Sequence, residues 1–187
     1  MYHTVVIGGG CLGAATAISL QRKLNKLGKS EKVCLIEKAV LCAAESSRHS
    51  GIVRSANADP DASMMASIST KMWKNLNKFW GVDMEVDEFG AIWIAKKNSD
   101  GENPAWSDLS NRMKKISLVF EEIDPDSAIQ KCGTTLITDT NESYYYEPEA
   151  FQLDPSILRS VLYNAIDDNG LELYEKTEVE AIVTTGN

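Results

Sequence analysis

The stretch that decides the fold is TVVIGGGCLG, which runs from Thr4 to Gly13. Its first four residues form a short β-branched run that ends at three glycines, which is typical of a buried strand. Residues 11–26 carry apolar side chains at helical spacing, and Gly28 ends the expected helix. A second apolar run covers 33–36. The pattern predicts a strand, a helix and a strand, with the two strands parallel through a right-handed crossover.

The glycines in this stretch have the spacing Gly8-x-Gly10-x-x-Gly13, and Glu37 ends the next strand 24 residues later. Gly8 permits a tight turn, Gly10 lets a pyrophosphate approach the backbone, and Gly13 lets the helix pack on the strand. Glu37 would accept hydrogen bonds from both hydroxyls of an adenosine ribose and would repel a 2′-phosphate. We therefore expect a dinucleotide site that does not take NADP. The spacing alone does not choose between NAD and FAD.

The composition is that of an ordinary folded protein with enough length to bury a core. The chain has 187 residues, of which 43% are hydrophobic, and its 27 acidic and 19 basic residues give a net charge of −8. Because no basic run occurs, we expect neither nucleic acid nor an anionic membrane surface as a partner. Residues 4–20 are uncharged, but they are too short for a membrane span and lack the basic start of a signal peptide.

The cysteines and acidic residues indicate neither disulfides nor a metal. Cys11, Cys34, Cys42 and Cys132 have no paired or zinc-ribbon spacing, so we expect reduced thiols in a cytoplasmic protein. Cys11 is expected to be a small filler residue and not a redox thiol. The acidic residues between 59 and 88 lack the spacing of a calcium loop.

The rest of the chain predicts further helices and strands. Residues 43–58 are small and polar and predict a structured loop, and 60–80 predict one amphipathic helix with Met64 and Ile68 on its apolar face. Asp154 and Pro155 begin an expected helix that runs to Asp168. The other elements that we expect are strands in 84–96, a helix over 104–117, a short helix after Asp124, and strands over 171–174 and 179–184.

The loop after the second strand carries groups that suit a long cofactor. Residues 46–51, SSRHSG, supply hydroxyls, positive charge and close backbone approach soon after the expected ribose-binding residue. A longer dinucleotide would need such further contacts to its phosphates. The alternative is an ordinary solvated polar loop.

Several segments resemble FAD-dependent oxidoreductases of the D-amino-acid oxidase group, most closely its sarcosine oxidase, glycine oxidase and dimethylglycine dehydrogenase branch. They are VVIGGGCLGAA from residue 5, LIEK at 35–38 and SSRHSGIVRS at 46–55, and 89–95 and 147–155 agree. The resemblance implies an α/β fold. It would comprise a three-layer, Rossmann-like FAD-binding domain with a parallel sheet and part of an inserted α+β substrate domain. The expected boundaries are 1–80 and 146–187 for the FAD-binding domain and 81–145 for the substrate-binding part.

The resemblance implies oxidation of the C–N bond of an amine or amino acid, a CH–NH or CH–NH2 donor, by hydride transfer to flavin. Arg54 would pair with the substrate carboxylate, although a surface arginine that offsets acidic charge is the alternative. His49 would bind the flavin covalently or through a hydrogen bond, or would face solvent. The expected cofactor-binding residues are Gly8, Gly10, Gly13, Glu37, Lys38, Ser46, Ser47, Arg48, His49, Ser50, Gly51 and Val179.

Length is the main difference from the group, because its members usually have chains about twice as long as this one. We therefore expect an N-terminal fragment, or a subunit that a second chain completes. Two alternative functions stay open. One is an FAD-linked 2-hydroxyacid dehydrogenase of the L-2-hydroxyglutarate type, because that branch has a loop similar to HSGIV at 49–53. The other is a non-catalytic nucleotide-binding subunit. The substrate would accordingly be a small amine, amino acid or hydroxyacid.

Overall fold

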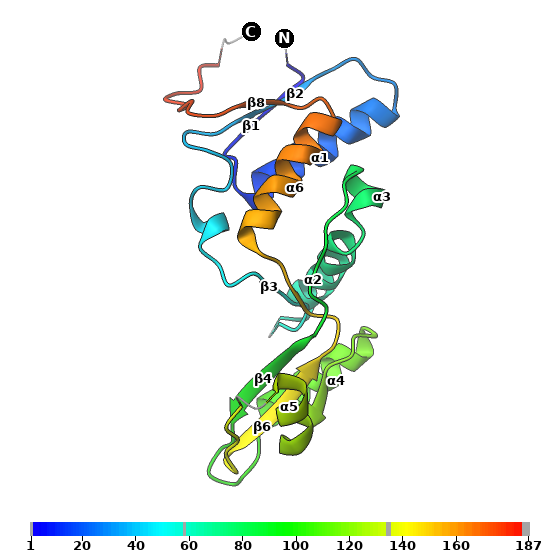
Figure 1. Ribbon diagram of the computed structural model, residues 1–187, viewed down its shortest axis with the longest axis vertical. Helices are drawn as coiled ribbons and strands as arrows, with labels where there is room; N and C mark the ends of the chain where they lie inside the picture. The colour runs from blue at the N-terminus through cyan, green and yellow to red at the C-terminus, as the bar shows by residue number, and fades with distance from the viewer. Residues whose placement is uncertain (1, 58, 134–135, 185–187) are drawn as a thin grey trace. The chain divides into compact units, whose positions relative to one another are not determined.

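The computed structural model describes residues 2–57, 59–133 and 136–184. The chain forms two compact units (Figure 1). The first comprises residues 1–51, 75–84 and 154–187, and the second comprises 52–74 and 85–153. These limits differ from the expected boundaries: residues 52–74 and 146–153 group with the second unit, and residues 81–84 group with the first. The assignment of the units to flavin and substrate binding stays a prediction.

The first unit contains a parallel sheet in the order β1-β2-β8. Its strands are β1 (Thr4–Ile7), β2 (Val33–Ile36) and β8 (Glu172–Tyr174), and helix α1 (Cys11–Lys26) connects the first two. Thr4 pairs with Val33, and Cys34 pairs with Glu172. The predicted parallel strand, helix and strand are confirmed with the expected bounds. This is the α/β arrangement of a Rossmann-like domain.

Helices α1 and α6 (Pro155–Asp168) lie on the same side of this sheet (Figure 1). Right-handed crossovers that add strands in one direction place their helices in this way. The described part of the chain thus supplies two layers, the sheet and the helices on one face. The buried side chains between them include Ala14, Ala17, Ile18, Val33, Leu35, Leu162 and Ala165. A short helix, α3 (Leu76–Trp80), also packs against α1.

Local capping explains where α6 begins. The Asp154 side chain accepts a hydrogen bond from the Ser156 N–H (2.7 Å), and Pro155 occupies the first turn. An acceptor at this position satisfies a backbone donor that has no partner within the helix, and proline loses nothing there. The predicted helix from Pro155 to Asp168 is confirmed.

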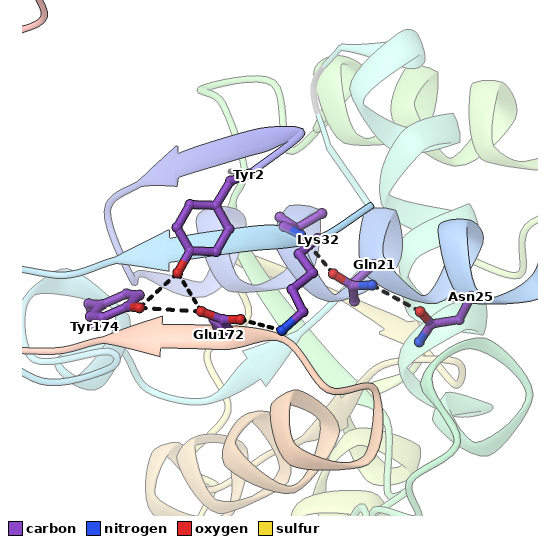
Figure 2. Close-up of polar contacts among 7 residues, drawn as sticks. Tyr2, Gln21, Asn25, Lys32, Glu172 and Tyr174 are labelled. Atoms are coloured by element: carbon purple, nitrogen blue, oxygen red, sulfur yellow. Dashed lines mark hydrogen bonds and ion pairs between the residues drawn. The ribbon is translucent and has the colours of Figure 1, made fainter. Parts of the chain in front are cut away.

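A polar network ties the start of the chain to β8 (Figure 2). The Glu172 carboxylate accepts hydrogen bonds from the Tyr2 hydroxyl and from the Lys32 ammonium (2.7 Å), and the Tyr2 and Tyr174 hydroxyls are 2.7 Å apart. The bonds from Lys32 and Tyr2 lower the pKa of Glu172 to about 2. The same contact raises the pKa of Tyr2, because ionising the hydroxyl beside a carboxylate is unfavourable.

The second unit is built on an antiparallel sheet in the order β4-β6-β5. Helix α4 covers this sheet through an apolar core that includes Leu109, Met113, Phe120 and Tyr145. A separate two-stranded antiparallel sheet pairs Ile52–Val53, which precede the three-stranded sheet in sequence, with Phe151–Gln152, which follow it. The elements of the unit are β3 (Ile52–Val53), α2 (Pro60–Trp73), β4 (Ala91–Lys96), α4 (Pro104–Lys115), β5 (Glu121–Ile123), α5 (Pro125–Cys132), β6 (Glu142–Glu147) and β7 (Phe151–Gln152).

Three expectations are wrong. The single helix over 60–80 is two helices, because Asn75 (φ −129°, ψ 39°) leaves the helical region, as a residue that competes for backbone hydrogen bonds often does. The predicted apolar face of α2 is exposed, with Met64 50% and Ile68 57% accessible, whereas Ser63 and Ser67 are buried. Residues 179–184 form no strand, since no neighbour for one lies among the residues that the structure describes.

Candidate dinucleotide-binding site

The glycine turn between β1 and α1 has a geometry that only glycine allows at two positions. Gly8 has φ +104°, a conformation that L side chains rarely adopt. A β-carbon on Gly13 would lie 1.9 Å from the Gly8 carbonyl oxygen. Helix α1 therefore starts in direct contact with the turn, and the Gly8 N–H donates to the Ile36 carbonyl at the end of β2 (2.8 Å). The turn fits a pyrophosphate at a helix N-terminus.

Glu37 lies beside the turn, as the sequence predicted for a ribose-binding carboxylate. Its Oε2 accepts a hydrogen bond from the Gly9 N–H (2.7 Å), and its Oε1 accepts one from the Ala39 N–H (2.8 Å). The side chain is half-buried. The two bonds fix the carboxylate at the turn, where its remaining lone pairs can accept hydroxyl donors.

The segment after β2 closes on the same turn. The Cys42 N–H donates to the Gly9 carbonyl (2.8 Å), and the Cys11 N–H donates to Ser46 Oγ (3.0 Å). Ser46 belongs to a 3-10 turn, η1 (Glu45–Ser47). A β-carbon on Gly10 would lie 3.1 Å from Ser46 Oγ, so residue 10 has little room for a side chain. The structure thus brings Gly8, Gly10, Gly13, Glu37 and Ser46 together.

Cys11 occupies the first position of α1 and is half-buried. Hydrogen bonding with the Cys42 thiol and the Ser46 hydroxyl, together with the charge of His49, lowers the pKa of Cys11 to about 6. The same interaction raises the pKa of Cys42, which is buried. Both thiols are free. A lowered pKa increases the thiolate fraction of a cysteine, and the thiolate is the nucleophile. Whether Cys11 is only a filler residue, as the sequence predicts, is therefore tested by its rate of alkylation.

The remaining loop candidates surround the turn less closely. His49 is exposed, and its Nδ1 accepts a hydrogen bond from the Gly51 N–H (2.9 Å), where Gly51 has φ +76°. The Ser47 hydroxyl donates to the Ala44 carbonyl (3.0 Å), so it is engaged within the loop. Arg48 and Ser50 are exposed. Their contacts with a cofactor stay predictions.

Two candidates flank Glu37 from the C-terminal side of the strands. Lys38 is exposed and directly follows Glu37. The Thr177 N–H donates to the Glu37 carbonyl (3.0 Å), which holds the segment after β8 next to this residue. Val179 is two residues further along and half-buried. Its role at the cofactor stays a prediction.

Arg54 belongs to the second unit. Its guanidinium carbon lies 4.3 Å from the centre of the Trp93 ring, and its Nη1 donates to the Ala56 carbonyl (3.0 Å). The Trp93 indole N–H donates in turn to Glu147 (3.1 Å). Sequence reasoning did not single out Glu147, because an acidic residue at the end of a tyrosine-rich strand looks like an exposed one.

Two further observations concern metals and membranes. Within residues 2–57, 59–133 and 136–184, no group of three or more histidine, cysteine or acidic side chains is arranged to hold a metal ion. None of the helices in these ranges is long and apolar enough to cross a membrane.

The fold and the turn define a Rossmann-like domain that binds a dinucleotide. The family model described as "DAO: FAD dependent oxidoreductase" matches residues 3–187. The chain therefore belongs to this family of FAD-dependent oxidoreductases, and FAD is the family's cofactor. The glycine turn and Glu37 fit the ADP half of FAD, as argued above.

Solved structures share the fold at low sequence identity. L-proline dehydrogenase from P. horikoshii has a TM-score of 0.82 and 20% identity, covering 97% of this chain and 46% of that one. L-amino acid deaminase from Proteus vulgaris has a TM-score of 0.79 and 19% identity, and the match covers 99% of this chain and 42% of the deaminase. Glycine oxidase from Geobacillus kaustophilus has a TM-score of 0.76 and 20% identity, and the match covers 95% of this chain and 47% of the oxidase. The chain spans less than half of each.

A curated relative from mouse is the mitochondrial pyruvate dehydrogenase phosphatase regulatory subunit. It is 23% identical over 177 residues, which make up 95% of this chain and 19% of the mouse protein. The chain thus spans about a fifth of that relative.

Proposed function

We propose that this chain is the FAD-binding part of an oxidoreductase that oxidises the C–N bond of an amine or amino acid. The observation that carries the proposal is the contact of Glu37 with Gly9 at a turn where Gly13 has no room for a side chain. Gly8, Gly10, Gly13 and Glu37 bind the ADP half of FAD. The names of the solved relatives, which include a proline dehydrogenase and a glycine oxidase, support an amino-acid substrate.

When bound, FAD would supply the redox chemistry of the reaction, the two-electron oxidation of the carbon next to nitrogen by hydride transfer. The protein binds and orients both partners. Arg54 pairs with the substrate carboxylate, since a planar guanidinium binds a carboxylate through two parallel hydrogen bonds. In this scheme no protein base is required, provided that the substrate nitrogen is unprotonated when the hydride leaves.

The loop residues Ser46, Ser47, Arg48, Ser50 and Gly51 contact the pyrophosphate and the flavin ring. Lys38, which follows Glu37 in sequence, and Val179, two residues after the Thr177 that is bonded to the Glu37 carbonyl, contact the adenosine end. These roles rest on the position of the loop after β2 and on the segment held beside Glu37.

His49 binds the flavin through its Nε2. Its Nδ1 accepts the Gly51 N–H, so Nε2 is the ring nitrogen left for the cofactor. Acid precipitation of the flavin-loaded protein distinguishes a covalent bond from a hydrogen bond. Colour in the pellet indicates covalent attachment, and colour in the supernatant excludes it.

The reaction is tested by anaerobic mixing of the FAD-loaded full-length protein with substrates. Proline, sarcosine and glycine are compared with lactate and 2-hydroxyglutarate while the flavin absorbance is followed. We expect at least one amine to bleach the flavin. Bleaching by hydroxyacids alone would favour the 2-hydroxyacid dehydrogenase instead, which the resemblance of residues 49–53 supports.

A non-catalytic nucleotide-binding subunit is the second candidate from another class. It is supported by the mouse relative, which is named as a regulatory subunit. Such a subunit would bind FAD, and none of the five substrates would reduce it. Co-purification with a second chain would then identify its partner. Cytoplasmic localisation belongs to the proposal as well, and fractionation tests it against the mitochondrial location in that relative's name.

A further inference from the structure

A cavity of about 400 Å³ lies within the second unit, between α4, β4 and the segment 54–57. Two indole rings form much of its apolar wall, with the centres of Trp93 and Trp106 5.5 Å apart. Trp106 also stacks on the buried Tyr145 ring at 5.5 Å and an angle of 27°. The wall is therefore held by the aromatic core behind it. The lining residues are Arg54, Ala56, Asn57, Trp93, Ala105, Trp106, Leu109 and Arg112.

Two cations line the cavity, and they differ in their partners. Arg112 is paired with Asp108 through its Nε (3.0 Å), so its charge is already balanced. Arg54 forms no ion pair with an acidic side chain in the part of the chain that the structure describes. It stacks on Trp93 and uses one N–H for the Ala56 carbonyl, and a guanidinium has five N–H groups. Arg54 is thus the group in this cavity that suits a carboxylate.

Glu147 fixes the two groups that hold Arg54. It is 1% exposed, and one of its oxygens accepts hydrogen bonds from the N–H groups of Ser55 and Ala56, the latter at 3.0 Å. Its other oxygen accepts the Trp93 indole N–H (3.1 Å). A buried carboxylate with three such donors is satisfied and rigid. It thereby orients both the Trp93 ring and the Ala56 carbonyl on which Arg54 rests.

We propose that this cavity binds an organic carboxylate with a flat or branched apolar body, with Arg54 as the carboxylate's partner and Glu147 as the residue that positions Arg54. The apolar body lies against Trp93 and Trp106. The proposal rests on the carboxylate-binding role proposed for Arg54 and adds to it a ligand class and a positioning residue.

The test is a titration of the full chain, labelled with nitrogen-15, with phenylacetate and with its neutral analogue 2-phenylethanol. The indole N–H signals are followed by NMR after assignment with single Trp→Phe variants. We expect phenylacetate to shift the signals of Trp93 and Trp106 saturably, and 2-phenylethanol to bind at least tenfold more weakly. The proposal is overturned if neither signal shifts, or if both compounds bind equally well.

Variants separate charge recognition from general damage to the cavity. Arg54→Gln should weaken phenylacetate at least tenfold and leave 2-phenylethanol unchanged. Glu147→Gln also releases the Trp93 ring, so it should weaken phenylacetate at least tenfold and 2-phenylethanol by a clearly smaller factor. The control is Lys114→Gln, which removes an exposed charge from α4, the helix that lines the cavity. It should change the affinity for neither compound. The positioning role is wrong if Glu147→Gln weakens both compounds by the same factor, or binds phenylacetate as tightly as the unmodified chain does. If Glu147→Gln does not fold, Arg54→Gln tests the proposal, which is overturned if that variant binds phenylacetate as tightly as the unmodified chain.

The titration does not depend on flavin reduction, so it separates this inference from the proposed function. Binding of phenylacetate without any amine oxidation would support the cavity and contradict the reaction. Amine oxidation without phenylacetate binding would contradict the cavity alone.

Discussion

Gly13 packs so closely on Gly8 that a β-carbon on residue 13 would lie 1.9 Å from the Gly8 carbonyl oxygen. Gly13→Ala must therefore displace either the turn or the start of α1, because the alanine β-carbon would clash with a backbone oxygen and not with the end of a flexible side chain. We expect at least a tenfold loss of FAD affinity, measured by quenching of flavin fluorescence. Thr16→Ala, an exposed change in the same helix, is the matched control. Equal FAD affinity of the two variants would contradict the account of the turn.

Glu37→Gln tests the ribose contact without removing the side chain. The amide keeps one acceptor oxygen and turns the other into a donor, which cannot accept a ribose hydroxyl. Hydrogen bonds to charged groups contribute about 1.5–3 kcal/mol, so we expect FAD to bind roughly 10- to 100-fold more weakly. Glu31→Gln, an exposed carboxylate shortly before β2, should bind FAD normally. A titration in which both variants behave alike would rule out the role of Glu37.

Cys11 should react with iodoacetamide as a thiolate at neutral pH. Its pKa is lowered to about 6 by hydrogen bonding with Cys42, assisted by Ser46 and His49. The alkylation rate, followed by peptide mass spectrometry, should therefore be half-maximal near pH 6. Replacing Cys42 by alanine removes the hydrogen-bond donor that is the largest cause of the shift, and should move the midpoint to higher pH. An unchanged midpoint in that variant would show that the two thiols do not interact.

Bound FAD should slow this alkylation, because Cys11 lies at the glycine turn that we propose binds the pyrophosphate. The exposed Cys132 belongs to the second unit and serves as an internal control in the same digest. Its alkylation rate should not depend on FAD. Equal protection of both cysteines would indicate a global effect and not binding at the turn.

The Glu172 network predicts how stability depends on acid pH. The folded-state pKa of Glu172 is about 2, below its ordinary value of 4.5, because Lys32 and Tyr2 bind the carboxylate form. The network therefore stabilises the fold fully above about pH 4.5 and loses this contribution as the pH falls towards 2. Urea midpoints of Glu172→Gln should show a weaker pH dependence in this window. A variant with the same slope as the unmodified chain would contradict the shift.

Local signals allowed the first unit to be predicted well. The bounds of β1, α1 and β2, the cap at Asp154 and the end of α6 follow from short stretches of sequence whose chemistry acts on neighbouring residues. The same holds for Glu37, whose place at the end of β2 fixes it beside the turn. The spacing of the glycines and of Glu37 in the sequence and the backbone geometry of the turn both require Glu37 to lie beside the turn.

The second unit could not be predicted as well, because its decisive contacts join distant residues. Glu147 meets Ser55 and Trp93 across more than fifty residues, and no local pattern indicates this. Helical periodicity identified an apolar stripe with Met64 and Ile68 but not which face of α2 becomes buried. Periodicity describes one helix, whereas burial depends on what packs against it.

The most direct test of the central claim is whether the purified full-length chain binds FAD at the glycine turn. The measurement is the visible absorption spectrum of the protein, as purified and after incubation with FAD and gel filtration. The account predicts flavin bands that elute with the protein and are lost in Gly13→Ala and reduced in Glu37→Gln. The account is contradicted if the unmodified protein stays colourless after incubation. It is also contradicted if both variants retain as much FAD as the unmodified protein.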